Sequence, residues 1–194
     1  MGTPGGDLSA GGIFCDLEMA FDCVNHKILL TKLEFYGITG NHCKLYKSCL
    51  MTRYQRTMLC NENSRITSSS SSKVEQGVPQ GSVLETLLFL VSINGLSKFI
   101  NDKSVPILFA DDTSILVSHL NPLTFYKTTS TVFQTLNAWF KHNLLPLNIA
   151  KTHSMKFVSK SNNHFELDIN YDNKSISAIT CTRFLGLTVN CTLT

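Results

Sequence analysis

The feature that most constrains this chain is a pair of adjacent aspartates between two apolar segments, in VPILFADDTSILVS. The flanking VPILF and SILVS have the composition of β-strands, and Asp is favoured in a tight turn between strands. We therefore predict a hairpin that carries Asp111 and Asp112 at its tip. Adjacent carboxylates repel each other, and moving a carboxylate out of water is unfavourable unless an opposite charge compensates it.

This aspartate pair has two interpretations. For the dipeptide alone, ordinary turn chemistry is the more frequent explanation. The alternative is a site for a hard divalent cation such as Mg²⁺, which takes oxygen ligands and removes the repulsion between the carboxylates.

A metal site needs a further carboxylate, and Asp16 also ends an apolar strand, in GIFCDLEMAFD. If the two strand systems are neighbours in one sheet, Asp16 and Asp111 would face each other across two metal ions. Two such ions stabilise the attacking and leaving oxygens of a phosphoryl displacement. An isolated Asp at a strand end, however, is more often a helix cap or a solvated residue.

The order of elements predicts an α+β fold with an antiparallel sheet, because the regular βαβ alternation of a doubly wound fold is missing. The predicted helices cover residues 26–37, 41–50, a segment from 83 and 124–143. The predicted strands cover residues 11–17, 54–60, 105–109, 114–118, 154–159, 165–170, 174–179 and 183–189, with YDNK (171–174) as a hairpin turn. Residues 62–73 are predicted to form a Ser-rich surface loop. We expect one partial domain over 1–194.

Local signals refine three of the helices. Gly37 is a plausible C-terminal stop for the first helix, whose apolar residues are Ile28, Leu29, Leu33 and Tyr36. Ser82 and Glu85 form a capping box for the helix from residue 83. Its expected apolar face is Leu84, Leu87, Leu88, Val91 and Ile93 or Leu96. The helix 124–143 is amphipathic. It should bury Phe125, Val132, Phe133, Leu136, Trp139 and Phe140.

Composition excludes several classes of protein. Hydrophobic residues make up 43% of the 194, which favours a packed core over disorder. The most apolar stretch, VLETLLFLVSI, is shorter than the ~20 residues of a membrane-spanning helix, so we expect no membrane partner. The first residues lack the apolar segment of a signal peptide. The net charge of +3 is compatible with a polyanionic partner without requiring one.

The 7 cysteines form no CxxC pair, so neither a zinc ribbon nor a thioredoxin-like site is indicated. We expect them to be reduced and mostly buried, in an intracellular protein of the nucleus or cytoplasm.

Five ordered motifs resemble those of a reverse transcriptase palm: FCDLEMAFD, GVPQGS, FADD, LNIAKT and FLGLTV. The combination is similar to non-LTR (LINE-type) retrotransposon polymerases, in particular the jockey-like group, and it covers residues from about 12 to 190. The resemblance implies RNA-directed DNA synthesis by two-metal nucleotidyl transfer. The implied partners are an RNA template, a DNA primer and dNTPs; protein partners are not indicated.

The resemblance also implies roles for individual residues. Asp16 and Asp111 would be the principal ligands of two Mg²⁺ ions, with Mn²⁺ as an alternative. Leu17 would add its backbone carbonyl and Asp112 a secondary carboxylate. Lys151 would donate a proton to the leaving pyrophosphate or stabilise its charge.

Further roles concern the nucleotide and the primer. Phe21 matches the steric gate that excludes a 2′-hydroxyl. The nucleotide or template would also be contacted by Pro79, Gln80, Gly81, Phe109 and Ala110. The primer end would be supported by Phe184, Leu185 and Gly186.

The sequence departs from the family pattern at Met19, where Lys is usual, at Glu85 and Thr86 in place of Gly-Pro, and at Gly95 in place of Asp. None of these positions is an expected metal ligand. We also expect most of the fingers and thumb to be missing. Two alternatives to an active polymerase therefore stay open: a catalytically inactive retroelement remnant, and a non-catalytic nucleic-acid-binding module.

Overall fold

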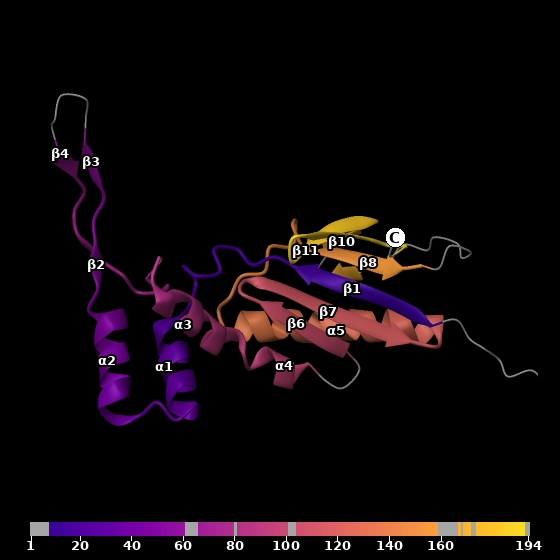
Figure 1. The fold of residues 1–194 in the computed structure, drawn as a ribbon, viewed down its shortest axis with the longest axis horizontal. Helices are drawn as coiled ribbons and strands as arrows, with labels where there is room; N and C mark the ends of the chain where they lie inside the picture. Colours follow the sequence, from indigo (N-terminus) through magenta and orange to yellow (C-terminus); the bar gives the residue numbers. More distant parts are fainter. Residues whose placement is uncertain are drawn as a thin grey trace, which may run out of the picture. The chain divides into compact units, whose positions relative to one another are not determined.

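The computed structural model describes residues 8–60, 66–79, 81–100, 104–158, 167, 169–171 and 174–192. The chain divides into two compact units (Figure 1). Unit 1 comprises Met1–Ala20 with Asn94–Thr194, and unit 2 comprises Phe21–Ile93. Each is described by itself below. Gln80 lies outside the described residues, as does part of the predicted Ser-rich loop.

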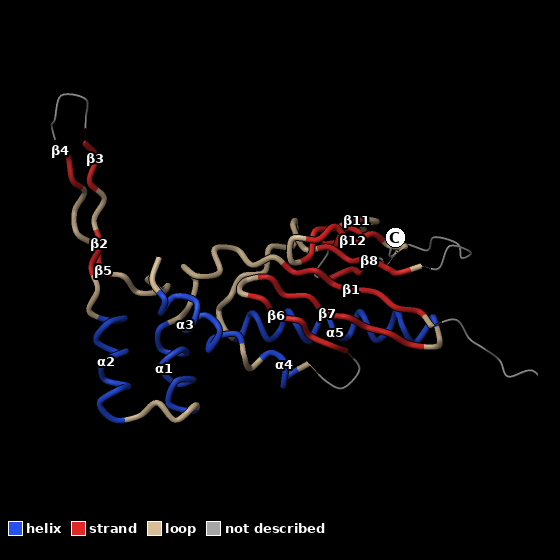
Figure 2. Tube along the Cα trace, viewed as in Figure 1, coloured by secondary structure: helices blue, strands red, loops and turns tan. Residues whose placement is uncertain are grey.

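Unit 1 is built on a six-stranded sheet with the order β6-β7-β1-β8-β10-β9 (Figure 2). Its strands are β1 (Ser9–Cys15), β6 (Ser104–Phe109), β7 (Asp112–His119), β8 (His153–Phe157), β9 (Ile169–Tyr171) and β10 (Lys174–Ala178). Helices and strands are segregated, which confirms the α+β prediction.

One strand pair departs from the expected antiparallel sheet: β10 pairs with β8 in parallel. The cause is the β9–β10 hairpin, in which Tyr171 pairs with Lys174 as the YDNK turn predicted. This hairpin places its second strand, rather than its first, beside β8, so the strand that meets β8 runs in the same direction.

Helix α5 (Pro122–His142) covers one face of this sheet. The Asn121 side chain accepts hydrogen bonds from the backbone N–H groups of Leu123 and Thr124, and Pro122 occupies the first turn, so the start of the helix is well capped. All six side chains of the predicted face are buried, as expected from the helical period: Phe125, Val132, Phe133, Leu136, Trp139 and Phe140.

Strand β1 lies close to α5 because it contains glycine. A Cβ atom on Gly11 would lie 2.9 Å from the Met155 carbonyl oxygen and 2.9 Å from Cζ of Phe125. Since side chains alternate along a strand, Ile13 and Cys15 face α5 with Gly11, whereas Phe14 faces the other side. Ile13 pairs with Ile115 of β7, and both side chains are fully buried.

The remaining elements of unit 1 are the short helix α4 (Leu96–Phe99) and the hairpin of β11 (Cys181–Phe184) and β12 (Leu187–Asn190). The prediction of one strand over 183–189 was wrong. Leu185 and Gly186 both have positive φ angles, 49° and 80°, as a two-residue hairpin turn requires. The glycine after Leu185 makes this reversal accessible.

Unit 2 contains three helices: α1 (His26–Phe35), α2 (Gly40–Met51) and α3 (Val83–Ile93). The Asn25 side chain caps α1 by accepting from the N–H groups of Lys27 and Ile28. Gly37 has a φ of 89°, so it ends the helix as predicted. In α1, Leu29 and Leu33 form the buried face, whereas Tyr36 is exposed.

The start of α3 follows the predicted capping box in part. Ser82 Oγ accepts from the Glu85 N–H at 3.2 Å, but the Glu85 carboxylate accepts from the Gly81 N–H, at 2.6 Å. The predicted apolar face was partly wrong: Leu88 and Ile93 are buried, but Leu84 and Leu87 are exposed. Ring packing shifts the buried face toward Phe89, which contacts Phe21 with a centroid distance of 4.8 Å.

Residues 54–60 and 66–73 form a narrow antiparallel ribbon. Strand β2 (Tyr54–Gln55) pairs with β5 (Ser72–Lys73), and β3 (Met58–Cys60) pairs with β4 (Ile66–Ser68). The expectation of a loop over 62–73 was therefore wrong at 66–68 and 72–73, whereas residues 69–71 between these strands have no regular secondary structure. Serine and threonine have small side chains that accept strand geometry once a partner strand supplies the ladder.

All 7 cysteines lie in the described residues and all are free thiols. Cys15 and Cys191 are buried, but Cys49, Cys60 and Cys181 are exposed, so the expectation of mostly buried cysteines was wrong. Burial raises the pKa of the Cys15 thiol, which keeps it protonated. Among the described residues, no helix is long and apolar enough to cross a membrane.

The close approach at Gly11 leads to a prediction about stability. The Gly11→Ala substitution should lower the free energy of unfolding by about 1–3 kcal/mol, because backbone and ring both occupy the space of the new methyl group. Gly95→Ala is the matched control, since its Cβ would meet only Trp139 Cζ2, at 3.7 Å. Urea unfolding followed by circular dichroism measures both, and equal losses for the two variants would contradict the packing described.

Candidate active site

Asp16 stands directly after β1, where the chain continues beside residues 146–148. The Asp16 carbonyl accepts from the Asn148 N–H at 2.9 Å, and the Glu18 N–H donates to the Pro146 carbonyl at 2.9 Å. These bonds flank an antiparallel bridge between Leu17 and Leu147. In such a pair the carbonyl of Leu17 points away from residues 146–148. It therefore lies on the side of β1 along which β7 runs.

The register of the sheet brings the aspartates of both motifs to one end. Cys15 of β1 pairs with Thr113 of β7, so the next positions are Asp16 and Asp112. These two positions share the sheet face that Phe14 occupies, opposite α5. Desolvation, Asp111 and Asp16, in that order, raise the pKa of the Asp112 carboxyl. The three carboxylates thus lie within electrostatic reach of one another.

The hairpin turn between β6 and β7 presents Asp111. Phe109 pairs with Asp112, so only Ala110 and Asp111 form the turn. The hairpin was predicted correctly, but its turn is shorter than the expected 110–113, because Asp112 and Thr113 belong to β7. Ala110 has a φ of 51°, in the left-handed region that residues with a Cβ atom seldom adopt. Such local strain persists only where surrounding structure enforces it, and it is common at functional sites. Here the pairing of the apolar strands β6 and β7 holds Ala110 in this conformation.

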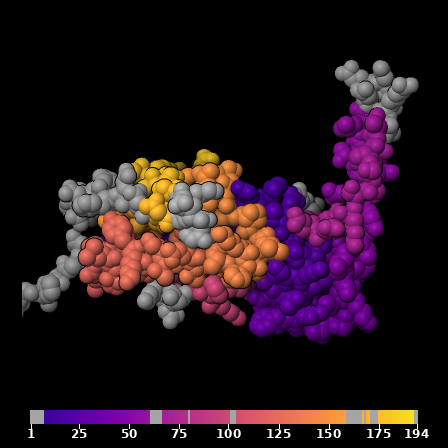
Figure 3. Space-filling model, turned by 180° about the vertical axis from the view of Figure 1, so that it is seen from behind, coloured from indigo at the N-terminus to yellow at the C-terminus, as the bar shows by residue number. Residues whose placement is uncertain are grey.

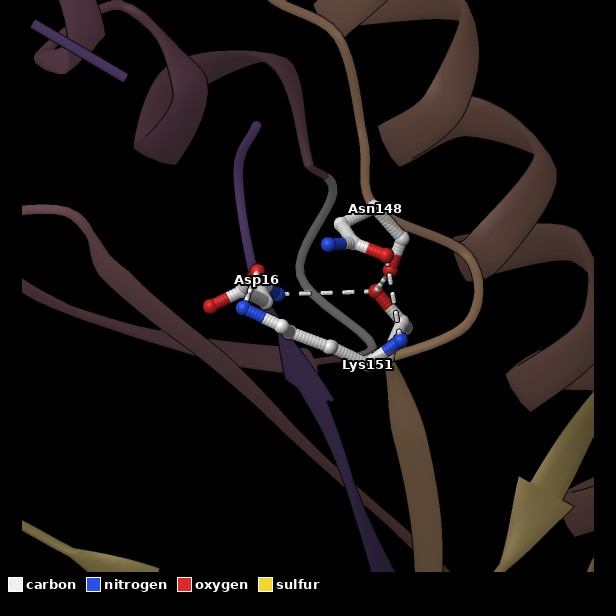
Figure 4. A network of polar contacts seen from close by, with 4 residues as sticks. Asp16, Asn148 and Lys151 are labelled. Carbon is white, nitrogen blue, oxygen red and sulfur yellow. Dashed lines mark hydrogen bonds and ion pairs between the residues drawn. The ribbon is translucent and has the colours of Figure 1, made fainter. Parts of the chain in front are cut away.

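Lys151 joins this cluster through a compact turn (Figure 4). Its Nζ lies 4.0 Å from Oδ2 of Asp16, and the lysine side chain is 71% exposed. An ion pair this long and exposed contributes little to stability. What the geometry provides instead is placement of a cation beside the carboxylates.

The turn itself is fixed by hydrogen bonds that involve Asn148 and Thr152. The Asn148 Oδ1 and carbonyl oxygen each accept from the Lys151 N–H at 3.2 Å. The buried Thr152 hydroxyl donates to the Asn148 carbonyl at 2.8 Å and accepts from the Asp16 N–H at 3.4 Å. Asp16 and Lys151 are therefore positioned by the same two residues.

The β11–β12 hairpin contacts the same face of the sheet. The ring of Phe184 meets that of Phe14 edge-on, with a centroid distance of 6.2 Å. Phe14 lies two residues before Asp16, and the turn residues Leu185 and Gly186 follow Phe184 directly. The structure thus links the predicted primer-supporting residues to the strand that carries Asp16.

The other predicted nucleotide-binding residues lie in unit 2, where GVPQGS is held by the end of the first motif. The Phe21 carbonyl accepts from the Val78 N–H at 3.0 Å, next to Pro79. Gly77 has a φ of 86°, and a Cβ atom there would lie 2.9 Å from the Asp22 carbonyl oxygen, so only glycine fits. Gly81 also has a positive φ, 76°.

Sequence reasoning missed three residues that hold these segments. Asn148 and Thr152 lie inside LNIAKT, where an Asn four residues before a Thr is a recognisable turn signal. The third is the buried His26, whose Nε2 lies 2.8 Å from the Gly77 carbonyl oxygen. Because a carbonyl only accepts, Nε2 carries the proton and donates. No sequence signal distinguished His26 from an ordinary core histidine.

The four departures from the family pattern do not disturb the carboxylates. Met19 is 68% exposed and has a φ of 46°, and Thr86 is exposed on α3. Glu85 strengthens the start of α3 through its bond to Gly81. Gly95 has room for a side chain.

The donor set suits a hard divalent cation, since three carboxylates and a backbone carbonyl are all oxygen ligands. In the part of the chain that the structure describes, however, no three His, Cys, Asp or Glu side chains are gathered closely enough to hold an ion. Desolvation and the neighbouring charges of Asp111 and Asp16 raise the pKa of Asp112, and a bound cation would offset these charges.

Comparison with solved structures identifies the fold. Apo telomerase from Candida tropicalis, truncated from its C-terminal domain, superposes with a TM-score of 0.61 at 16% identity, over 96% of this chain and 35% of that one. Telomerase from Candida albicans in complex with a fragment of telomeric RNA gives a TM-score of 0.60 at 12% identity, over 93% of this chain and 30% of that one. At these identities the likeness defines the class of fold, that of a polymerase palm.

The family follows from the sequence comparison. The family described as reverse transcriptase (RNA-dependent DNA polymerase) matches residues 7–189, across both units. The chain belongs to this family, as the motif series predicted. Reverse transcriptases as a family use divalent metal ions.

Two curated relatives are encoded by transposable elements. The probable RNA-directed DNA polymerase from transposon BS of Drosophila melanogaster is 28% identical over 94% of this chain. The Pol polyprotein from the type-1 retrotransposable element R2 of Popillia japonica is 24% identical over 91% of it. The chain spans only 20% and 30% of the lengths of these two relatives.

The raised pKa of Asp112, caused by desolvation and then by the charges of Asp111 and Asp16, predicts a pH-dependent gain of stability in the Asp112→Asn variant. Because the pKa of this carboxyl is raised in the folded state, the folded state binds the proton more tightly than the unfolded chain. Stability is therefore full below the unfolded pKa of about 3.8 and decreases as the pH rises through the folded pKa. Without metal, Asp112→Asn should have a higher Tm than the parent at pH 7.

The gain should disappear at acid pH, where both states of Asp112 are protonated. Thermal unfolding in EDTA at pH 3 and pH 7 measures it, with Glu75→Gln as an exposed control carboxylate in unit 2. A gain of the same size at both pH values would show that charge repulsion is not the cause.

Proposed function

We propose that this chain catalyses RNA-directed DNA synthesis, in which the 3′-hydroxyl of a primer attacks the α-phosphate of a dNTP on an RNA template. The observation that carries the proposal is the convergence of Asp16, Asp111 and Asp112 at one end of the unit 1 sheet. Its membership of the reverse transcriptase family supports the choice of this reaction over other uses of clustered carboxylates.

Two divalent ions, Mg²⁺ or alternatively Mn²⁺, would be held by Asp16, Asp111, Asp112 and the carbonyl of Leu17. When bound, they would supply positive charge to the attacking and leaving oxygens. The contribution of the chain is to hold its donors in place. Asp16 is fixed on both sides of its peptide by Asn148 and Thr152, and Asp111 by the two-residue turn.

Lys151 would act on the leaving pyrophosphate. Its ammonium group is exposed and lies beside Asp16, so it is free to approach a phosphate placed next to that carboxylate. There it would donate a proton or stabilise the developing negative charge. Because Asn148 fixes the Lys151 backbone, only the flexible side chain needs to move.

Other residues would select and orient the substrates. Phe21 would exclude a ribose 2′-hydroxyl, and Phe109, Ala110, Pro79, Gln80 and Gly81 would contact the nucleotide or template. The turn of Phe184, Leu185 and Gly186 would support the primer end. The position of the Lys151 ammonium group beside Asp16 supports an active polymerase over the two inactive alternatives.

Primer extension tests the proposal directly. The chain should extend an oligo(dT) primer on poly(rA) with dTTP and Mg²⁺. Asp111→Asn should lower the rate by at least about 100-fold, because charge stabilisation in the transition state is lost. Glu34→Gln serves as the control, since Glu34 is exposed on α1 and lies in unit 2. No extension by the parent chain, with folding confirmed by circular dichroism, would contradict the proposal.

The role of Phe21 gives a second prediction. Phe21→Val should raise incorporation of rUTP relative to dTTP by at least about tenfold, because a smaller side chain leaves room for the 2′-hydroxyl. Phe99→Val, at an exposed position of α4, should leave the ratio unchanged. Competition between the two nucleotides in single-turnover extension measures the ratio. If both variants give the same ratio as the parent, the role of Phe21 is limited to its packing against Phe89 of α3.

A further inference from the structure

A two-stranded ribbon projects from the helices of unit 2 (Figure 1). It comprises residues 53–60 and 66–74, and here it is called the ribbon. Beyond the strand pairs, the Val74 N–H donates to the Arg53 carbonyl at 2.9 Å and the Ser69 N–H to the Thr57 carbonyl at 2.9 Å. The ladder is thus continuous from the end of α2 through its described length, apart from a one-residue shift of register between Gln55–Ser72 and Met58–Ser68.

The ribbon has no hydrophobic core of its own. Tyr54, Met58 and Leu59 are 63%, 60% and 67% exposed. Figure 3 shows the side chains of this segment standing clear of the rest of unit 2. An isolated two-stranded hairpin is marginally stable in water, and large apolar side chains exposed together on a monomer commonly mark a binding surface. The ribbon therefore has the properties of an element that binds a partner.

The charge of this region indicates which partner. Residues 40–76 contain six Lys or Arg and two Asp or Glu, a net charge of +4. Because the whole chain carries +3, the remaining 157 residues together carry −1. The positive charge of the protein is thus concentrated on α2 and the ribbon. Such concentration is the electrostatic signature of a polyanion-binding surface.

The placement of individual side chains fits a nucleic acid better than an acidic protein. Lys73 lies directly opposite Tyr54 in the ladder, so a cation and an aromatic ring share one face. Arg56 is also exposed. The returning segment offers the small, exposed hydroxyl groups of Ser70, Ser71 and Ser72, and serine hydroxyls commonly donate to phosphate oxygens. Aromatic rings between cations are typical of surfaces that contact bases and sugars along a charged backbone.

We propose that the ribbon is a second nucleic-acid-binding site, which holds the phosphodiester backbone through Arg53, Arg56 and Lys73 while Tyr54 contacts a base or sugar. The site is separate from the carboxylates of unit 1 and does not depend on catalysis. A ribbon of two strands fits the major groove of a B-form duplex, and an exposed tyrosine also suits a single strand.

Salt dependence of binding by the full chain tests the proposal. Fluorescence anisotropy would follow labelled single-stranded RNA and a labelled RNA–DNA duplex, between 50 and 300 mM KCl, without dNTPs or metal. The Arg53→Gln/Arg56→Gln/Lys73→Gln variant should reduce the slope of log K against log salt by about 2 to 3 and weaken binding at least about tenfold at 100 mM, because each lost phosphate contact removes about 0.7–0.9 from the slope.

The matched control is Lys27→Gln/Lys98→Gln/Lys127→Gln, which removes the same charge from exposed positions outside the ribbon. Its slope should change by less than about 1. Arg53→Lys/Arg56→Lys should retain the parent slope, since the charge is kept. Tyr54→Ala should weaken binding without a change of slope. The probe whose affinity falls more in this variant is the nucleic acid that the ribbon prefers.

Two results would overturn the proposal. One is equal loss of slope in the ribbon variant and the control, which would show binding by overall charge alone. The other is self-association of the parent chain that Met58→Ser/Leu59→Ser abolishes while nucleic-acid affinity is unchanged. Sedimentation velocity measures this, and it would make the ribbon an interface between copies of the chain. Circular dichroism verifies that each variant is folded.

Discussion

The constraint on which the site depends is the burial of β1 and β7 against α5, because it fixes three like charges at one end of the sheet. Ile13 and Ile115 are fully buried, and each contributes about 1.5–3 kcal/mol through removal of its side chain from water. Two carboxylates ~4 Å apart in water repel by only about 1 kcal/mol. Burial of the isoleucines therefore outweighs the repulsion, and the carboxylates stay where the strands place them.

The same burial fixes which face of the sheet carries them. A shift of one residue between β1 and β7 would move Asp112 from the open face to the face that α5 covers. That shift would bury an unpaired carboxylate and expose the isoleucines, and both changes are unfavourable. The two-residue turn then leaves Ala110 in a left-handed conformation. Precise placement of Asp111 and the local strain at Ala110 are consequences of one register.

Sequence periodicity was sufficient for the elements whose burial is determined locally. The hairpin around Asp111 and the buried face of α5 were predicted correctly because each pattern repeats over many residues. The buried face of α3 was not predicted correctly, since it depends on the packing of Phe89 against Phe21, which lies far away in the chain. The strands in the Ser-rich segment were missed for the same reason, because their partner, rather than their own composition, supplies the ladder.

The candidate site residues could be named from the sequence, but the residues that hold them in place could not. The positions of Asp16 and Asp111 at strand ends, and the order of the motifs, were enough to select these two residues. Neither motif indicates that the Thr152 hydroxyl bonds both the Asp16 backbone and the Asn148 backbone. Thr152 contacts the Asp16 backbone across 136 positions of sequence. The His26 ring bonds the Gly77 carbonyl across 51 positions of sequence. Such contacts depend on how distant segments pack, and only a structure shows them.

The distribution of charge in the chain divides two requirements of a polymerase between different segments. A carboxylate cluster that binds cations repels the phosphates of a template and a primer, so affinity for nucleic acid has to come from elsewhere. Residues outside 40–76 carry a net −1, so their overall charge does not favour a polyanion. The basic ribbon can supply this affinity, because it presents its cations on a separate unit of the structure. Repulsion at the proposed active site and attraction at the proposed ribbon site would thus have one electrostatic origin, the uneven distribution of charge along the chain.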